Sequence, residues 1–223
     1  MSFCKLKYKD ENGKTIDNSS VEKPEQYLAD IYIPRDATVL EMGARYGTVS
    51  CVINKRLKDP TRQVSVEPDE RVLKALEKNK KRNKCEFNIL YGTVSNTPVK
   101  LTKLDSWDGY GTTGEKDETS SIPHYSISEL EEKYNLKFDT LVADCEGCLE
   151  VFFDENTEFI KKLKIVFIEK DYPEKTNYRK VTNFLKNNNF DRIVGGQNLQ
   201  HEIWKKQKGQ NVGGRRKTKR RKH

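Results

Sequence analysis

The sequence predicts an α/β protein with a doubly wound, mostly parallel Rossmann-like sheet in three α/β/α layers. Short apolar runs suited to buried strands alternate with longer amphipathic segments along most of the 223 residues, and this alternation is typical of a parallel sheet covered by helices. The segment 38–50 also combines a strand, a turn with two glycines and the start of a helix. One domain with tails accounts for the length.

Residues 1–34 are expected to form a hairpin and a helix that brace the main domain. Weak alternation over residues 3–17 surrounds an Asp-Glu-Asn-Gly turn, which predicts a short hairpin. Ser19 and Glu22 have the spacing of a capping box, which predicts a helix over residues 21–31.

The main domain is expected over residues 35–208, with five parallel strands and a final antiparallel pair. The strands are predicted at 39–41, 64–67, 87–91, 138–143, 164–168, 190–194 and 201–205. Helices are predicted between them at 49–57, 69–83, 126–134, 149–153, 159–163 and 178–187, with Ser126 and Glu129 as a second capping box. A further extended piece at 99–101 precedes the aperiodic segment 105–121, whose length indicates a functional or mobile loop.

The net charge of +8 is concentrated at the C-terminus. The last eleven residues carry seven lysines and arginines, which leaves +1 for residues 1–212. We expect residues 209–223 to form a disordered basic tail that binds nucleic acid or another polyanion, acts as a nuclear address, or only aids solubility. Since neither a membrane-spanning run nor a signal segment is present, a soluble cytoplasmic protein without a membrane partner is expected, with the nucleus as the alternative.

Five cysteines, an odd number, indicate free thiols in a reducing compartment. Cys145 and Cys148 form a C-x-x-C pair, which leaves a redox role open. A zinc site would need two more ligands at similar spacing, and the three histidines do not supply them. We expect small apolar packing at a strand end instead.

Acidic residues end four of the predicted strands: Glu41, Glu67, Asp144 and Glu169. In a doubly wound sheet these carboxyl ends share the edge where ligands bind. Glu67 follows Gly43 by 24 positions, which suits a carboxylate that accepts the hydroxyls of a ribose. The absence of a third glycine and of a Gly-Lys-Ser/Thr segment disfavours dinucleotides and nucleoside triphosphates. The negative charge favours a cationic cofactor, S-adenosylmethionine.

Five sequence blocks carry a resemblance to a known family. They are V-L-E-M-G-A-R-Y-G-T-V-S at 39–50, V-S-V-E-P-D at 64–69, L-Y-G-T-V-S-N at 90–96, F-D-T-L-V-A-D-C-E-G-C at 138–148 and I-V-F-I-E-K-D at 165–171. Over residues 35–205 the chain resembles the FkbM family of S-adenosylmethionine-dependent O-methyltransferases. The D-x-E-G block is the most specific of these motifs.

The resemblance implies a cofactor site and a catalytic site. It places the methionine portion at the first glycine loop, the ribose at Glu67 and the adenine around residues 92–95, so that the cofactor residues are Glu41, Gly43, Ala44, Tyr46, Gly47, Glu67, Pro68, Gly92, Thr93, Val94 and Asp144. Asp144 is the first candidate for the base or orienting group, followed by Glu146, Glu169 and Lys170. Val142 and Leu149 depart from the lysine and glutamate that family members often have there.

Several questions stay open at this level. Asp144, Glu169 and Asp171 could together hold a divalent cation through oxygen ligands, although metal dependence is not favoured. The acceptor is expected to be a hydroxyl of a glycan or small molecule. The alternative is an RNA cap or ribose 2′-hydroxyl, with the basic tail as anchor, and a third reading is a binding module that has lost turnover. The oligomeric state is left open.

Overall fold

The computed structural model describes residues 5–18, 20–103, 112–196 and 199–207. Its central sheet has seven strands in the order β12-β13-β11-β10-β3-β4-β5. In that order the strands span Phe190–Val194, His201–Lys206, Ile165–Glu169, Thr140–Ala143, Val39–Met42, Gln63–Glu67 and Asn88–Tyr91. The predicted α/β class and the position of each main strand are confirmed.

The sheet is parallel except for β13. β10 pairs in parallel with both β3 and β11, and β4 pairs in parallel with β3 and β5. β13 runs antiparallel to β11 and to β12, as the sequence predicted. The chain builds the sheet outward from β3 to β5 and then returns to place β10 on the other side of β3, so the order reverses between β3 and β10. Such a switch point leaves a crevice beyond the strand ends.

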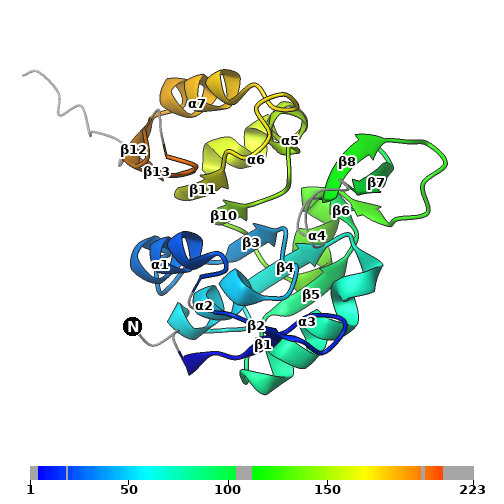
Figure 1. Cartoon of the computed structure of the whole chain (residues 1–223). Coiled ribbons are helices and arrows are strands. Elements are labelled where there is room, and N and C mark those ends of the chain that lie inside the picture. Colours follow the sequence, from blue (N-terminus) through cyan, green and yellow to red (C-terminus); the bar gives the residue numbers. More distant parts are fainter. Residues whose placement is uncertain (1–4, 19, 104–111, 197–198, 208–223) are drawn as a thin grey trace, which may run out of the picture.

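Helices cover both faces of the sheet (Figure 1). One face carries α1 (Lys23–Tyr32), α2 (Thr48–Arg56) and α3 (Glu70–Arg82), and the other carries α4 (Ile127–Tyr134), α5 (Leu149–Glu155), α6 (Thr157–Lys162) and α7 (Tyr178–Asn187). The strands serve both layers because their side chains alternate. Leu141 and Ala143 pack with α5 and α6, whereas Val142 packs with α1 and α2.

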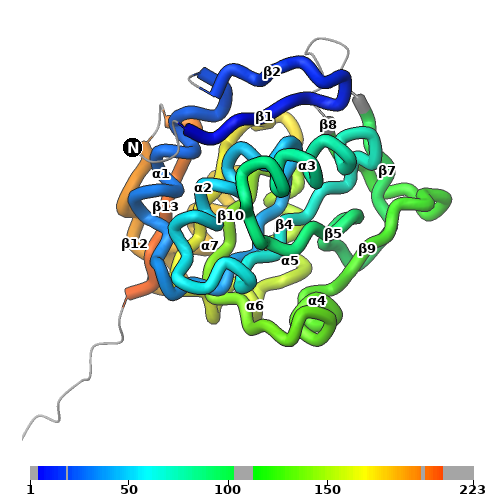
Figure 2. The backbone as a smooth tube through the Cα atoms, turned by 90° about the horizontal axis from the view of Figure 1, so that it is seen from below, coloured from blue at the N-terminus to red at the C-terminus, as the bar shows by residue number. Residues whose placement is uncertain are grey.

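The N-terminal hairpin consists of β1 (Tyr8–Lys9) and β2 (Thr15–Ile16) and lies along α3 (Figure 2). The Asn79 side chain on α3 ties it down, because its Nδ2 donates to the Lys9 carbonyl at 2.8 Å and its Oδ1 accepts from the Lys9 amide at 3.0 Å. Tyr8 is completely buried and donates from its hydroxyl to the Thr48 carbonyl. The predicted hairpin is confirmed.

Helix starts follow one of the two predicted capping boxes. Ser126 and Glu129 form a reciprocal box at α4, as predicted. The box predicted from Ser19 and Glu22 is wrong in its geometry: α1 begins at Lys23, and Glu22 is the N-cap residue in the left-handed region, with φ of 49° and no side-chain cap bond. Ser19 lies outside the described residues.

Short strands extend one end of the molecule. β6 (Thr93–Val94) pairs with β9 (His124–Tyr125), and β7 (Val99–Lys103) pairs with β8 (Thr112–Lys116) in a hairpin that projects from the body (Figure 1). The aperiodic segment 105–121 was predicted as a loop. Its second half contains β8, while residues 104–111 lie outside the described part.

Within the described residues, none of the helices combines the length and the apolar character that crossing a membrane requires. The predicted basic tail, 209–223, lies outside the described residues.

Candidate functional site

The ends of β3 and β10 meet at a close backbone contact. A Cβ atom added to Gly43 would lie 1.7 Å from the Asp144 carbonyl oxygen, and Gly43 has φ of 92°. The Gly43 amide donates to the Val66 carbonyl at 3.1 Å, and the Asp144 amide donates to the Met42 carbonyl at 3.0 Å. Only glycine fits this position, which therefore brings the end of β10 beside the first glycine loop.

A cavity of about 250 Å³ opens at this switch point. Its described lining comes from the ends of β3, β4, β5 and β10, from β6 and the β7–β8 hairpin, from α5 and from Glu22 before α1. Six carboxylate residues and two cationic residues line it, namely Glu22, Glu67, Glu115, Asp144, Glu146 and Glu155 against Arg45 and Lys116. The excess of acidic side chains suits a ligand with positive charge.

Glu67 is held in a fixed position at the end of β4. Its Oε2 accepts from the Arg45 amide at 2.7 Å, and its Oε1 accepts from the Asp69 amide at 2.8 Å. The residue is 4% exposed. Burial raises the pKa of Glu67 to about 7, although these two amide donors oppose the shift. Each oxygen keeps a lone pair that could accept from a ligand hydroxyl.

The other end of the cavity is formed by Gly92, Thr93 and Val94. A Cβ atom on Gly92 would lie 2.4 Å from the Pro123 carbonyl oxygen, and the Gly92 φ is 135°. The Thr93 amide donates to the same Pro123 carbonyl at 2.9 Å. The segment is therefore fixed in an extended form by its contact with residues 123–125, and with Val66 and Pro68 it forms a partly apolar part of the cavity lining.

Asp144 follows β10, across Gly43 from Glu67, and also lines the cavity. Its Oδ1 is buried and has no hydrogen-bond partner among the described residues. Burial, together with the carboxyls of Glu25 and Glu169, raises the pKa of Asp144 well above its ordinary value. Burial and the neighbouring Asp171 carboxyl raise the pKa of Glu146 to about 9. These crowded carboxyls thus retain protons that a bound cation would displace.

The structure brings most predicted cofactor residues together. Those that line the cavity are Gly43, Glu67, Pro68, Gly92, Thr93, Val94 and Asp144. Four others are absent from its described lining: Glu41, Ala44, Tyr46 and Gly47. Gly47 instead starts α2 with φ of 79°, and the Tyr46 hydroxyl donates to Glu11 at 2.5 Å.

The position of Glu41 differs from the prediction that all four acidic strand ends face the ligand-binding edge of the sheet. Its Oε2 accepts from Gln63 Nε2 at 3.1 Å and from the Ser65 hydroxyl, and the residue is 2% exposed. Glu41 is one residue before the last position of β3, so its side chain points to the α2 layer rather than beyond the strand end. Burial raises the pKa of Glu41 to about 7.

The predicted catalytic residues separate into two groups. Asp144 and Glu146 line the cavity. Lys170 does not: its Nζ contacts Glu202 Oε1 at 2.9 Å and the Gly196 carbonyl at 3.2 Å. Glu169 also lies outside the cavity lining, and its Oε1 is 3.2 Å from His201 Nε2.

The three carboxylates predicted as a metal set do converge. Ligand oxygens of Asp144, Glu169 and Asp171 all lie within 4.8 Å of one another. Asp171 Oδ1 already accepts from the Tyr178 hydroxyl and the Tyr172 amide, both at 2.8 Å.

Glu22 is a cavity residue that the sequence interpretation missed. It lies at the start of α1, lines the cavity and accepts a hydrogen bond from the Thr48 hydroxyl. Its left-handed φ of 49° turns the chain just before α1. From the sequence, an acidic residue beside a helix start predicts only that it caps the helix. The neighbouring residues therefore gave no indication that α1 docks over the first glycine loop.

The expectation of free thiols is wrong for Cys145 and Cys148, which form a disulfide with a Cα separation of 5.5 Å. Both residues line the cavity on either side of Glu146 and Gly147. Cys51 and Cys85 are free and buried, and Cys4 lies outside the described residues. The bridge closes a four-residue turn that carries Glu146 into the cavity wall.

Comparisons with known proteins concern the fold of the whole chain. No protein-family profile matches the chain, and no curated protein sequence matches it. Among solved structures, the cofactor-bound protein Rv0187 from MTB has a TM-score of 0.51 at 11% identity, covering 82% of this chain and 79% of that chain. A candidate tRNA (m1A22) methyltransferase from Streptococcus pneumoniae, in complex with S-adenosyl-L-methionine, has a TM-score of 0.50 at 11% identity, covering 83% and 74%.

A third similar structure is a protein of the NADB-Rossmann superfamily from Streptococcus agalactiae, with a TM-score of 0.50 and 11% identity over 82% of this chain and 67% of that chain. At these identities the likeness establishes a Rossmann-like fold.

Proposed function

We propose that this chain is an S-adenosylmethionine-dependent methyltransferase that acts on a hydroxyl group. The observation that carries the proposal is the cavity at the β3–β10 switch point, where Glu67 and Asp144 lie on opposite sides of a glycine-lined floor. The FkbM resemblance and the S-adenosyl-L-methionine bound to the structurally similar Streptococcus pneumoniae protein agree with this reading.

The cavity has the features that this cofactor needs. Glu67 offers two fixed carboxylate oxygens for ribose hydroxyls, and the wall at Gly92–Val94 suits a flat base. Two acidic residues of the lining are Glu22, just before α1, and Asp144, just after β10. Their negative charge suits the ammonium and the sulfonium of the cofactor. When bound, S-adenosylmethionine supplies an electrophilic methyl group on a cationic sulfur.

The protein's task in such a reaction is to hold the acceptor hydroxyl and to remove its proton. Asp144 is our first candidate for both roles, because it lines the cavity and its Oδ1 lacks a partner among the described residues. Its raised pKa makes the ionised carboxylate a stronger base than an exposed aspartate. Glu146, whose pKa is also raised, is the second candidate for this proton.

Methyl transfer from radiolabelled S-adenosylmethionine to a panel of sugars, glycans, small alcohols, peptides and capped RNA tests the proposal. We expect labelled product with hydroxyl acceptors, and a loss of about 10²–10⁴-fold in kcat for Asp144→Asn. Lys170→Met is the matched control, because Lys170 contacts Glu202 outside the cavity and its loss should leave cofactor affinity unchanged. Absence of transfer to every acceptor, with cofactor bound, would favour a binding module.

An RNA acceptor is the second candidate, because seven of the last eleven residues are lysine or arginine. Affinity for a capped oligonucleotide should then fall steeply as salt rises, and removal of residues 213–223 should reduce that salt dependence. Equal affinity with and without these residues would exclude this role of the tail.

A further inference from the structure

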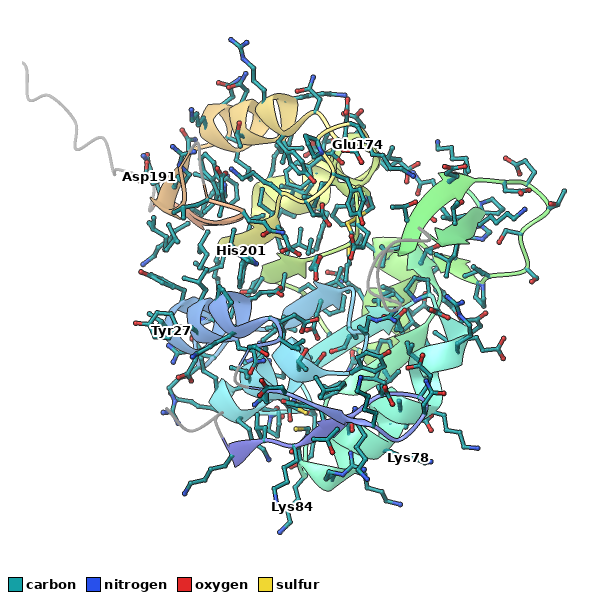
Figure 3. All side chains as sticks on the ribbon, in the orientation of Figure 1. Tyr27, Lys78, Lys84, Glu174, Asp191 and His201 are labelled. Carbon is teal, nitrogen blue, oxygen red and sulfur yellow. A yellow bond between two sulfur atoms is a disulfide. The ribbon has the colours of Figure 1, made fainter. Side chains whose placement is uncertain are left out.

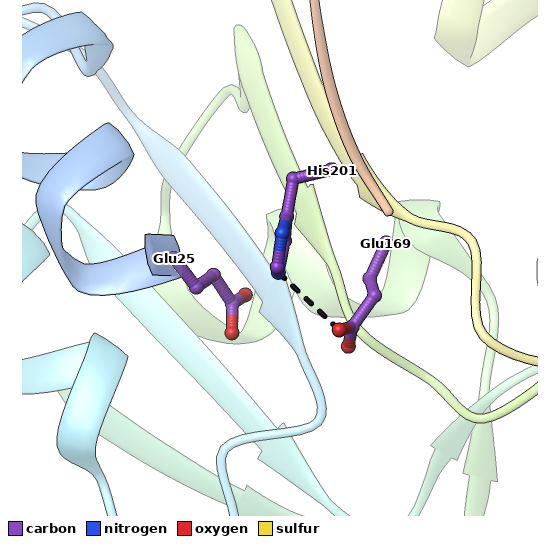
Figure 4. A group of neighbouring side chains, drawn as sticks. All are labelled: Glu25, Glu169 and His201. Carbon is purple, nitrogen blue, oxygen red and sulfur yellow. Dashed lines mark ion pairs between the residues drawn. The ribbon is translucent and has the colours of Figure 1, made fainter. Parts of the chain in front are cut away.

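A second cluster of potential ligands lies behind the cavity, where α1 meets the ends of β11 and β13. It comprises Glu25, Glu169 and His201, whose ligand atoms all lie within 4.8 Å of one another. Figure 4 shows the three side chains facing one another, and Figure 3 marks the position of His201, whose side chain is 14% exposed. Of these residues only Glu169 was singled out by the sequence.

The register of β11 with β13 fixes two of the three residues, Glu169 and His201. Glu169 and His201 are direct partners in the antiparallel pairing of β11 with β13. Glu169 Oε1 and His201 Nε2 are 3.2 Å apart. Two ligands bound at about 2.1 Å to one tetrahedral or octahedral cation lie about 3.0–3.4 Å apart, so this pair already has the separation of adjacent ligands.

Glu25 provides the independent observation. It is in the first turn of α1 and is only 3% exposed. Within the described part of the chain, no hydrogen bond or ion pair reaches its carboxylate, which points toward His201 and Glu169 (Figure 4). A buried carboxylate without a partner is costly unless a proton or a cation accompanies it.

The surroundings are short of positive charge. Ligand oxygens of Asp144 and Asp171 also lie within 4.8 Å of Glu169, and each of the two residues has one buried oxygen without a partner among the described residues. The nearest lysine on the same strand end, Lys170, is already paired with Glu202. A divalent cation would offset this charge.

We propose that Glu25, Glu169 and His201 bind a divalent transition-metal ion. One imidazole with two carboxylates is a mixed nitrogen and oxygen set, which suits Mn²⁺ or Zn²⁺ better than Mg²⁺ or Ca²⁺. Glu169 faces both this set and Asp144, so the ion would place positive charge next to the cavity. The proposal does not rest on methyl transfer, because ion binding is measured without cofactor or acceptor.

Titration of the untagged full-length chain with Mn²⁺, following free Mn²⁺ by electron paramagnetic resonance, tests the proposal. We expect one ion per chain and a nitrogen coupling from His201 in the pulsed spectrum of bound Mn²⁺. His201→Gln and Glu25→Gln come from different elements, and each should weaken binding at least tenfold. His201→Gln should also remove the nitrogen coupling.

Two controls accompany these variants. His124→Gln removes an exposed histidine on β9 and should leave the affinity unchanged. Asp171→Asn should weaken binding less than His201→Gln does, since Asp171 Oδ1 is already occupied by two donors. Thermal melting in chelator checks that each variant is folded, and Mn²⁺ should raise the Tm of the wild type more than that of His201→Gln.

The result that would overturn the proposal is no specific Mn²⁺ binding by the wild type, or bound Mn²⁺ without nitrogen coupling. Loss of binding in Asp171→Asn but not in His201→Gln would likewise contradict it and place the ion among Asp144, Glu169 and Asp171.

Discussion

The Gly43 backbone touches the Asp144 carbonyl so closely that a Cβ atom would lie 1.7 Å from that oxygen. This contact joins the first glycine loop to the acidic turn after β10 and sets the floor of the cavity. We expect Gly43→Ala to force β3 and β10 apart and to lower the free energy of unfolding by about 3 kcal/mol or more.

Gly13→Ala is the matched control for this variant. Gly13 has a similar φ of 83° but no atom within 4 Å of an added Cβ, so it should lose only about 1 kcal/mol from backbone strain. Urea denaturation of both variants measures the difference. Equal losses would show that the close contact with Asp144 does not determine the stability of this junction.

Cofactor affinity should depend on the ionisation of Glu67. Burial raises its pKa to about 7, and donors from ribose hydroxyls favour the ionised form. Binding should therefore release a proton, and affinity should rise as the pH increases from 6 to 8. Calorimetry in buffers of different ionisation enthalpy measures this release. In Glu67→Gln the proton release that comes from Glu67 should vanish. An unchanged pH dependence of cofactor affinity in this variant would contradict the assignment.

Glu41 should affect stability rather than cofactor binding. Its pKa is about 7 in the folded chain, raised by burial from the reference value of 4.5. Its contribution is therefore fully present below about pH 4.5 and is lost as the pH rises toward 7, by at most about 3 kcal/mol. Glu41→Gln keeps an oxygen for the Gln63 and Ser65 donors and should flatten this part of the pH-stability curve.

The unfolding free energy of wild type and Glu41→Gln between pH 4.5 and 8 measures that difference. Cofactor affinity should stay within about twofold of the wild type, because Glu41 is absent from the described cavity lining. A large loss of affinity without loss of stability would restore the role that the family resemblance implied for Glu41.

The Cys145–Cys148 bridge should be detectable by thiol counting. The denatured chain should gain two titratable thiols on reduction, and reduction should lower stability by about 2 kcal/mol or less, because the closed loop is short. Cys145→Ser with Cys148→Ser should show neither change on reduction. Five titratable thiols before reduction would instead support the free-thiol expectation.

The central strands β3, β4, β10 and β11 could be predicted because they are buried on both faces and therefore stand out as short apolar runs. β8 was missed for the opposite reason: Thr112–Lys116 is a polar strand in a two-stranded hairpin, so its sequence resembles a loop. Capping-box spacing correctly predicted the start of α4 at Ser126, where only neighbouring residues form the cap. It failed at α1, where Glu22 is the N-cap residue and lines the cavity.

The site was predictable where it depends on strand ends and glycines, as at Gly43, Glu67 and Asp144. It was not predictable where the direction of a side chain, or a contact between residues distant in the sequence, decides which residues belong to the site. Glu41 differs from a true strand-end residue by one position, which turns it to the other face. Glu25 and His201 are 176 positions apart in the sequence, and only the docking of α1 against β13 brings them together.

Calorimetric titration of S-adenosylmethionine into the wild type and into Glu67→Ala tests whether this cavity binds the cofactor. We expect one molecule bound per chain by the wild type and at least tenfold weaker binding by Glu67→Ala, which loses the acceptor for the ribose hydroxyls. No binding by the wild type, or equal binding by the two proteins, would contradict the assignment of this cavity to the cofactor.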